Sequence, residues 1–296
     1  MPELPEVEVV RLGLAPAVTA SLVRAVTVLD ERSLRRHEGP SEDFVDRVTG
    51  ALLNAPERRG KFLWIPLAGE RADEAVVVHL GMSGQVLLRS PDAPRDRLTR
   101  IVLDLEHPEH GPLRVDFVDQ RIFGSMALDG LVPTRDRPEQ RIPSQVVHIA
   151  RDPLDPDFSE RAFFAALARK RTTIKRALLD QTLVSGIGNI YADEALWAAR
   201  IHYDQPTETL SRPRARRLLD EVRAVLGKAL AEGGTSFDAQ YVNVNGASGY
   251  FSHSLNAYGR HGEPCPRCGR PIVREVFMNR GSHFCPSCQR LRAVRG

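Results

Sequence analysis

The segment Cys265–Cys288, CPRCGRPIVREVFMNRGSHFCPSC, contains all four cysteines of the chain. They form two pairs, Cys265 with Cys268 and Cys285 with Cys288, and sixteen residues separate the pairs. This spacing predicts one structural zinc ion held by four thiolates, which would fold the segment into a finger. Two disulfides are the alternative. Because the N-terminus lacks a secretory signal, we expect a reducing cytosol, where thiols stay reduced and zinc is favoured.

Length and composition exclude several classes of protein. The chain has 296 residues, of which 27% are charged and 42% hydrophobic, an ordinary balance for a globular protein of two or three domains. No stretch reaches the roughly 18 apolar residues of a membrane helix. The net charge of +3 argues against a strongly basic, ribosomal-type RNA-binding protein. Arg greatly outnumbers Lys, which suits phosphate contacts but also follows from GC-rich coding. We expect a cytoplasmic monomer.

The first 133 residues are predicted to be mainly β-structure. Short β-branched runs bounded by Gly, Pro or Asp occupy residues 75–80, 85–89, 99–105 and 113–118. Apolar residues at helical spacing predict an earlier helix over residues 7–17. Residues 134–157 are rich in Pro and charge and are interpreted as a linker.

Helical periodicity dominates after the linker. Ser159 is a predicted N-cap, and helices are expected over residues 173–183, 189–199 and 213–231. Residues 233–258 are rich in Gly, Asn and Ser, which is typical of a long loop. The predicted domains are therefore residues 1–133, a linker over 134–157, a helical domain over 158–258 and the finger over 259–296.

The N-terminus, MPELPEVE, carries candidate chemistry in Pro2 and Glu3. A small second residue permits removal of Met1, which would leave Pro2 with a secondary amine at the chain end. Such an amine can form an iminium with an aldehyde-like carbon, and part of it is neutral near pH 7. Glu3 is placed for proton transfer. Alone, a proline here is also a common device for starting a helix.

Several segments together resemble the formamidopyrimidine-DNA glycosylase family over nearly the whole chain. These segments are PELPEVE at residues 2–8, RGK at 59–61, HLGMSG at 79–84, GIGNIYA at 186–192 and the four-cysteine finger. The resemblance implies an α+β multidomain fold. Its parts would be an N-terminal β-sandwich with flanking helices, a helix–two-turn–helix domain and a C-terminal zinc finger, with damaged duplex DNA as the partner.

The resemblance assigns catalytic roles to Pro2, Glu3 and Lys61. The Pro2 amine would attack C1′ of the damaged nucleotide and displace the base, and Glu3 would assist proton transfers. The resulting iminium permits β- and δ-elimination of the phosphates. Lys61 would reach into the active site, and its charge would favour the neutral form of the Pro2 amine. A solvated lysine beside a strand is the alternative for Lys61.

The resemblance also implies three side chains that fill the space left by an extruded base, namely Met82, Arg121 and Phe123. Met82 lies between glycines, which indicates an exposed tip rather than a packed core residue. Family members commonly have Pro and a second basic residue where this chain has Gln120 and Ile122. The loss of that basic residue is expected to weaken one phosphate contact.

Both the helical domain and the finger are expected to contribute contacts to DNA phosphates. Asn189 begins a helix after a Gly-rich turn, where backbone N–H groups suit phosphate oxygens. Arg280, between the cysteine pairs, resembles the finger-tip arginine of the family. Lys175 and Arg171 are weaker candidates, and a solvated helix face is their alternative.

The loop of residues 241–251, YVNVNGASGYF, resembles the lesion-covering loop of the family. Gly246, Gly249, Tyr250 and Phe251 match, but Ala247 and Ser248 replace a frequent Lys and Pro. A lysine contact to the flipped base is therefore not inherited, although backbone amides of the loop can still bind a carbonyl group.

The expected function is a bifunctional DNA glycosylase and AP lyase that excises oxidised purines, namely formamidopyrimidines and 8-oxoguanine. An endonuclease VIII-type enzyme acting on oxidised pyrimidines is the nearest alternative, but that group usually has Gly where this chain has Leu4. A catalytically silent zinc protein that binds damaged DNA is the second. Zinc is expected to be structural only, because a four-cysteine site leaves no open position.

Overall fold

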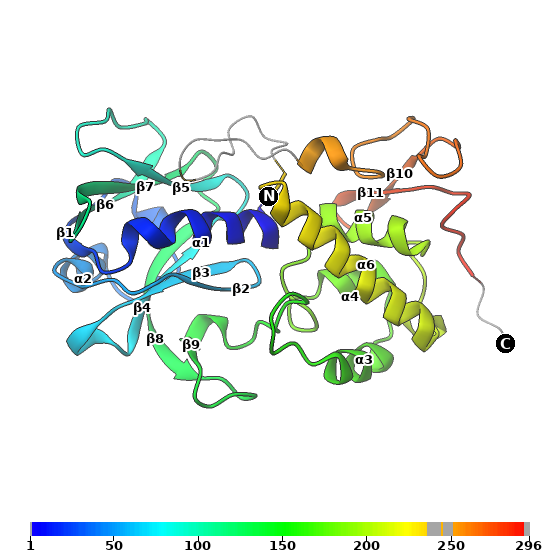
Figure 1. The fold of residues 1–296 in the computed structure, drawn as a ribbon, viewed down its shortest axis with the longest axis horizontal. Helices are drawn as coiled ribbons and strands as arrows, with labels where there is room; N and C mark the ends of the chain where they lie inside the picture. The colour runs from blue at the N-terminus through cyan, green and yellow to red at the C-terminus, as the bar shows by residue number, and fades with distance from the viewer. Residues whose placement is uncertain (1, 236–243, 245–250, 293–296) are drawn as a thin grey trace. The chain divides into compact units, whose positions relative to one another are not determined.

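The computed structural model describes residues 2–235, 244 and 251–292 (Figure 1). Contacts between Cα atoms divide the chain into two compact units. The first comprises Met1–His148 and Gly233–Gly249, and the second comprises Ile149–Glu232 and Tyr250–Gly296.

Two antiparallel sheets form the first unit. One has the strand order β1-β6-β7-β5 and the other the order β2-β3-β4-β8-β9. The strands are β1 (Leu22–Val28), β2 (Glu57–Arg59), β3 (Phe62–Pro66), β4 (Glu74–His79), β5 (Gly84–Arg89), β6 (Thr99–His107), β7 (Gly111–Asp119), β8 (Ser125–Pro133) and β9 (Arg141–Pro143).

Apolar side chains of both sheets meet in one core, and helices α1 (Leu4–Val18) and α2 (Ser41–Val48) contribute to it. Leu103 and Phe117 come from the four-stranded sheet, Ile65 and Val76 from the five-stranded sheet, and Leu14 from α1. Short 3-10 helices lie at Glu31–Leu34, Gly69–Arg71 and Ser144–Val146. The predicted sandwich with flanking helices is confirmed.

The second unit is helical and carries one β-hairpin. Ser159 caps the first helix, because its Oγ accepts a hydrogen bond from the Ala162 N–H at 3.2 Å. The elements are α3 (Glu160–Arg169), α4 (Ile174–Leu179), α5 (Asn189–Ala199), α6 (Arg212–Ala231), β10 (Val273–Phe277) and β11 (Arg280–Phe284), with 3-10 helices at Thr207–Thr209 and Phe251–Ser254.

Helix α5 is buried along most of its length and joins the helices to the cysteine segment. Trp197 of α5 packs with Ala257, Ile272 and two of the cysteines. Nearer its start, the buried Glu194 carboxylate accepts hydrogen bonds from the backbone N–H groups of residues 256, 257 and 258 at 2.8–2.9 Å. The finger is therefore anchored on α5 by both apolar packing and a buried acceptor.

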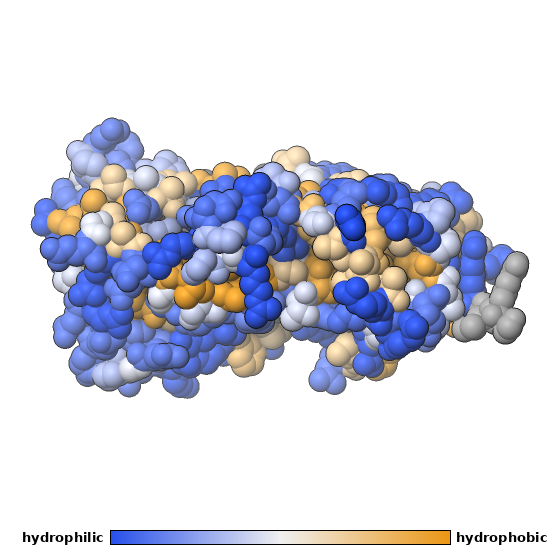
Figure 2. Space-filling model, turned by 90° about the horizontal axis from the view of Figure 1, so that it is seen from below, coloured by the Kyte–Doolittle hydropathy of each residue, from blue (hydrophilic) through white to orange (hydrophobic). Residues whose placement is uncertain are grey.

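Hydrophilic side chains cover most of the face drawn in Figure 2, and hydrophobic ones gather in separate patches. Among the described residues, no helix has both the length and the apolar character needed to cross a bilayer.

Candidate functional site

The start of α1 holds the residue expected to be the nucleophile. Pro2 is buried and precedes Glu3, the N-cap residue of α1. The Glu3 N–H donates to Glu6 Oε2 at 2.8 Å, and the Glu3 side chain accepts from the Glu6 N–H, so the two form a capping box. The other Glu6 oxygen accepts from the Thr235 N–H at 2.7 Å and from its hydroxyl at 2.9 Å.

Glu6 was not singled out by the sequence, although it fixes the backbone directly after Pro2. Its side chain is only 2% exposed, and its two oxygens contact segments far apart in the chain. The E-x-x-E spacing of Glu3 and Glu6 was the available signal, because a carboxylate three residues after an N-cap typically completes a capping box.

Lys61 lies in the turn between β2 and β3, where Gly60 has a positive φ of 58°. It is half-buried. Burial, together with the charges of Arg36, Lys61 and Arg35, lowers the pKa of His79 to about 4. These cations therefore act on the end of β4, a place where an anionic group is favoured.

His79 is neutral near pH 7 and supports the turn that carries Met82. Its Nδ1 accepts a hydrogen bond from the Gly81 N–H at 3.2 Å, and its ring lies 4.7 Å from that of Phe62. Nδ1 must be unprotonated to accept this bond.

The structure brings Met82, Arg121 and Phe123 together at the surface. Met82 is 37% exposed and Phe123 is 47% exposed, so the two form part of one exposed apolar surface around Arg121. Arg121 lies between them, with Nη1 at 3.9 Å from the Met82 sulfur and its guanidinium carbon at 5.6 Å from the centre of the Phe123 ring. We call these three residues the wedge.

A buried carboxylate connects the two turns that carry the wedge. Asp119 is fully buried at the end of β7. Its Oδ1 accepts from the Ser83 hydroxyl at 2.6 Å and from the Arg121 N–H at 3.1 Å, and its Oδ2 accepts from the Gly124 N–H at 2.7 Å. One side chain therefore holds the turn after Met82 and both ends of the turn that contains Phe123.

The same two turns pack backbone against backbone. Gly81 has φ +62°, and a Cβ there would lie 2.4 Å from the Phe123 carbonyl carbon, so only glycine fits. Arg35 donates to the Ile122 carbonyl oxygen at 2.6 Å and also to that of Phe123. Ile122 has φ 55°, a strained conformation for a β-branched residue. The sequence did not single out Asp119, Ser83 or Arg35.

Asn189 is hydrogen-bonded to the backbone of the residue that follows Arg280 in the second unit. Asn189 is the first residue of α5, and its Nδ2 donates to the Gly281 carbonyl oxygen at 3.1 Å. Arg280 precedes Gly281 at the start of β11 and is exposed. This hydrogen bond joins the start of α5 to the start of β11.

Lys175 is not at the surface, in contrast to the expected phosphate contact. Its side chain is fully buried, and its Nζ lies 2.6 Å from Asp193 Oδ1 and 3.0 Å from the Ser282 hydroxyl. Asp193 also accepts from the Ser282 hydroxyl at 3.0 Å and from the His283 N–H at 2.8 Å. The ammonium is engaged by a buried carboxylate, because an unpaired charge is too costly inside a protein, and it holds the hairpin against α5.

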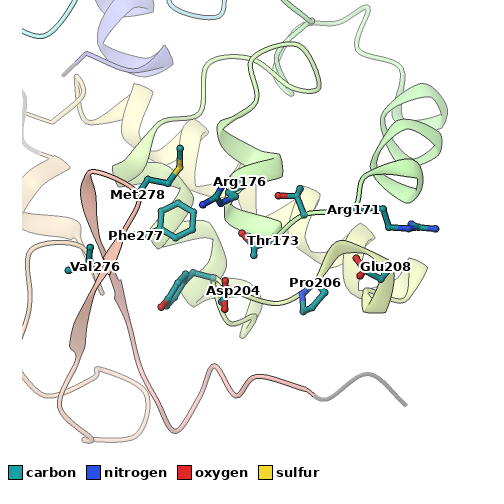
Figure 3. A pocket seen from close by; sticks show the side chains of 11 residues that line it. Arg171, Thr173, Arg176, Asp204, Pro206, Glu208, Val276, Phe277 and Met278 are labelled. Carbon is teal, nitrogen blue, oxygen red and sulfur yellow. The ribbon is translucent and has the colours of Figure 1, made fainter. Parts of the chain in front are cut away.

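Arg171, the other weaker candidate, is exposed and lines a cavity of about 570 Å³. Figure 3 shows Arg176 directed toward Phe277 of the hairpin and Arg171 directed away from it. Arg171 therefore remains accessible, unlike Lys175.

The four cysteines fit one tetrahedral zinc ion. Their sulfurs lie within 4.8 Å of one another, compared with an S–S separation of about 3.8 Å around zinc with bonds of about 2.3 Å. None of the four forms a disulfide, and the Cys268 and Cys285 sulfurs are 3.5 Å apart, far longer than a disulfide bond. The second unit thus holds one structural zinc ion.

The expected lesion-covering loop lies mostly outside the described residues, including Gly246, Ala247, Ser248, Gly249 and Tyr250. At its end, the buried Phe251 packs its ring 5.7 Å from that of Tyr191 in α5.

Comparisons with known proteins agree with this arrangement. Residues 1–126 match the model of the formamidopyrimidine-DNA glycosylase N-terminal domain, and residues 149–240 match the H2TH domain of the same family. Residues 262–291 match the zinc finger found in FPG and IleRS.

Whole-chain relatives give the same result. The chain is 65% identical to formamidopyrimidine-DNA glycosylase of Leifsonia xyli subsp. xyli, over 98% of this chain and 100% of the relative. It resembles Lactococcus lactis Fpg in complex with DNA containing an abasic site, with a TM-score of 0.81, 32% identity, and coverage of 97% of this chain and 99% of that chain. It also resembles wild-type Lactococcus lactis Fpg in complex with DNA containing N7-benzyl-Fapy-dG, with a TM-score of 0.82, 31% identity, and coverage of 98% and 100%.

Proposed function

The chain belongs to the formamidopyrimidine-DNA glycosylase family, and from this premise we propose that it excises oxidised purines from duplex DNA through the amine of Pro2. It is a DNA glycosylase and AP lyase of base excision repair. The gathering of Met82, Arg121 and Phe123 carries the proposal most directly. An exposed apolar pair with a cation between them suits the space left in a base stack by an extruded nucleotide.

In the proposed reaction, removal of Met1 exposes the secondary amine of Pro2. That amine attacks C1′ of the damaged nucleotide, the bond from C1′ to the base breaks, and the ring-opened sugar remains attached as an iminium. Glu3 assists the proton transfers, while Glu6 holds the Glu3 backbone through the 2.8 Å hydrogen bond. Hydrolysis of the iminium after β- and δ-elimination regenerates the amine.

Lys61 and the phosphate-binding residues complete the proposed machinery. Lys61 binds the damaged nucleotide and favours the neutral form of the Pro2 amine. Asn189 and Arg280 bind backbone phosphates, and their proximity at the hairpin supports a shared role. Arg171 is a further candidate because it is exposed. The burial of Lys175 supports a structural role for it in place of a phosphate contact. The zinc ion shapes the finger and takes no part in the chemistry.

Borohydride trapping tests the nucleophile. A lesion duplex and the mature protein are expected to give a covalent adduct on the N-terminal peptide, identified by mass spectrometry. A variant with extra residues before Pro2 has its nitrogen locked in an amide and is expected to give none. An adduct that persists in the blocked variant contradicts the role of Pro2, and intact mass shows whether Met1 has been removed.

A panel of duplexes tests the substrate. Each contains formamidopyrimidine, 8-oxoguanine or an oxidised pyrimidine, and kcat/KM is compared. We expect the purine lesions to be preferred, in line with the DNA bound by the Lactococcus lactis relative. Preference for the pyrimidine contradicts this expectation. We further propose that the protein acts as a monomer in the cytoplasm, on the DNA of the nucleoid.

A further inference from the structure

A second cationic site lies in the second unit, beside the zinc-binding Cys288, and includes none of the phosphate-binding candidates named above. Five arginines line a single cavity of about 610 Å³, within the size range of ligand sites. Among the described residues that line it, none is acidic. We call it the arginine pocket, and its five arginines are Arg200, Arg214, Arg217, Arg290 and Arg292.

Buried amide side chains fix the backbone that carries two of these arginines. Gln205 is fully buried; its Oε1 accepts from the Arg292 N–H at 3.0 Å, and its Nε2 donates to the Arg292 carbonyl oxygen at 3.1 Å. Gln289 is 1% exposed; its Oε1 accepts from the Cys285 N–H at 2.8 Å, and its Nε2 donates to the Ile201 carbonyl oxygen at 2.9 Å. The segment after the last cysteine is therefore held in place on both sides of Arg290.

The other three arginines come from the end of α5 and the first turns of α6. Arg200 ends α5 in the left-handed conformation, with φ 56°, which is uncommon for a residue other than glycine. Arg214 and Arg217 lie near the start of α6. The pocket is thus assembled from three separate segments with fixed backbones, in contrast to a run of arginines on one solvated helix face.

Most of the arginines in this pocket have no acidic partner among the described residues. Among the described residues, Arg200, Arg214, Arg290 and Arg292 form no ion pair with an acidic side chain, and Arg217 lies 4.0 Å from Glu221. Burial and the charge of Arg292 lower the pKa of Arg214, which indicates that the two guanidinium groups repel each other. Like charges held together in this way favour a bound anion.

We propose that the arginine pocket binds a ligand with several adjacent phosphate groups. Guanidinium groups pair bidentately with phosphate oxygens, and a single carboxylate cannot neutralise five of them. The phosphates belong either to a free compound, such as a nucleoside polyphosphate, or to the backbone of a second nucleic acid strand. Neither Asn189 nor Arg280 is among the residues that line the pocket.

Titration with inorganic tripolyphosphate tests the pocket in the full-length, zinc-loaded protein. The pocket variant is Arg214→Ala with Arg292→Ala. The control variant is Arg135→Ala with Arg161→Ala, two exposed positions outside the pocket, which removes the same net charge. We expect calorimetry to show binding to the wild type and the control, and an affinity at least about tenfold weaker in the pocket variant, because charge-assisted hydrogen bonds are lost.

Equal affinity in the two variants, or no binding to the wild type, overturns the proposal. Excision of a lesion from duplex DNA provides the folding check, and both variants are expected to retain it. A variant that has lost excision is replaced by the milder pair Arg214→Gln and Arg292→Gln, to which the same criterion applies.

A second measurement identifies the source of the phosphates. The protein is saturated with a lesion duplex, and a labelled undamaged duplex is added. If the second duplex binds to the control and binds more weakly to the pocket variant, the site is assigned to a nucleic acid backbone. If tripolyphosphate binds but the second duplex does not, the site is assigned to a free compound.

Discussion

At the scale of single residues, Asp119 is the side chain through which the wedge is held in position. Replacing Asp119 with Asn leaves one oxygen to accept hydrogen bonds but turns an NH₂ group toward another donor, either the Gly124 N–H or the Ser83 and Arg121 donors. We expect kcat/KM on a lesion duplex to fall about tenfold, the effect of losing a hydrogen bond to a charged group. Single-turnover excision measures it.

The matched control separates positioning from a general loss of structure. A lesion in single-stranded DNA needs no wedge, so we expect the Asp119→Asn variant to process it at close to the wild-type rate. Ser83→Ala removes one of the three hydrogen bonds to Asp119 and should lower kcat/KM by less. Ser83→Thr keeps the hydroxyl group and should retain the activity. Equal losses on both substrates would show that the carboxylate serves overall stability instead.

His79 gives the first unit a defined sensitivity to acid. Its pKa is about 4 in the folded protein, compared with about 6.5 in an unfolded chain. Above pH 6.5 both states are neutral and His79 contributes no pH dependence. As the pH falls from 6.5 to 4, the unfolded state binds a proton that the folded state excludes, so stability decreases.

We expect this loss to reach about 3 kcal/mol at pH 4, from the linkage between a pKa difference and free energy. Urea unfolding of the wild type and of His79→Gln, measured at several pH values, isolates the contribution, because glutamine does not titrate but can still accept from the Gly81 N–H. Parallel pH profiles for the two proteins would refute the assignment.

At the scale of elements, periodicity and turn signals predicted the long, regular segments well. Helix α5 has the predicted bounds, residues 189–199, and four predicted strands correspond to β4, β5, β6 and β7. Helix α1 begins at Leu4 rather than Val7, because the capping box and Pro5 extend it by almost a turn. Strand β9 and a 3-10 helix lie within the predicted linker, where Pro-rich composition hid them.

The candidate site was predictable where one residue carries a recognisable motif, and not where contacts join distant segments. Met82, Arg121 and Phe123 were predicted from the resemblance, and the structure brings them together. The link from Asp119 to Ser83 spans 36 residues and depends on the pairing of β5 with β7. A single sequence shows no local signal for such a pair, so the positioning residue was missed although the residues it positions were found.

Lys175 illustrates the same limit, and its burial supports a prediction for α4 and the hairpin. Lys175→Met removes one partner of a buried ion pair and leaves Asp193 charged, which should lower the free energy of unfolding by about 3–5 kcal/mol. Thermal and urea unfolding measure the change. The double variant Lys175→Met with Asp193→Asn should regain part of it. A Lys175→Met protein of unchanged stability but weakened DNA binding would instead support the phosphate contact first expected for Lys175.

The zinc finger provides the second prediction at this scale. Chelation should release one zinc ion per chain and unfold the hairpin of β10 and β11, because the four cysteines lose the ion that links them and the segment has little core of its own. Hydrogen exchange should show loss of protection in residues 273–284 while β4 and β6 keep theirs. Retained protection in the hairpin after complete zinc loss would show that packing on Trp197 suffices.

At the scale of the whole molecule, a net charge of +3 is small for a protein that binds a polyanion. The individual cationic side chains therefore have different structural roles, and only some of them are free to contact DNA. Arg35 holds backbone carbonyls, Lys175 is buried in an ion pair, and Arg280 is exposed at the hairpin. Only side chains of the last kind are available to neutralise phosphates, so overall charge is a poor guide to the strength of DNA binding.

This division predicts how DNA affinity responds to salt. For duplex DNA, each phosphate neutralised by the protein contributes about 0.9 to the slope of log K against log salt concentration. Arg280→Ala should therefore reduce that slope by about one unit, and Arg280→Lys should keep it. Met82→Ala should weaken binding to a lesion duplex without changing the slope, because a wedge in the base stack releases no counterions. Fluorescence anisotropy across a salt series measures all four proteins. A changed slope for Met82→Ala, or an unchanged one for Arg280→Ala, would reverse the roles assigned to wedge and hairpin.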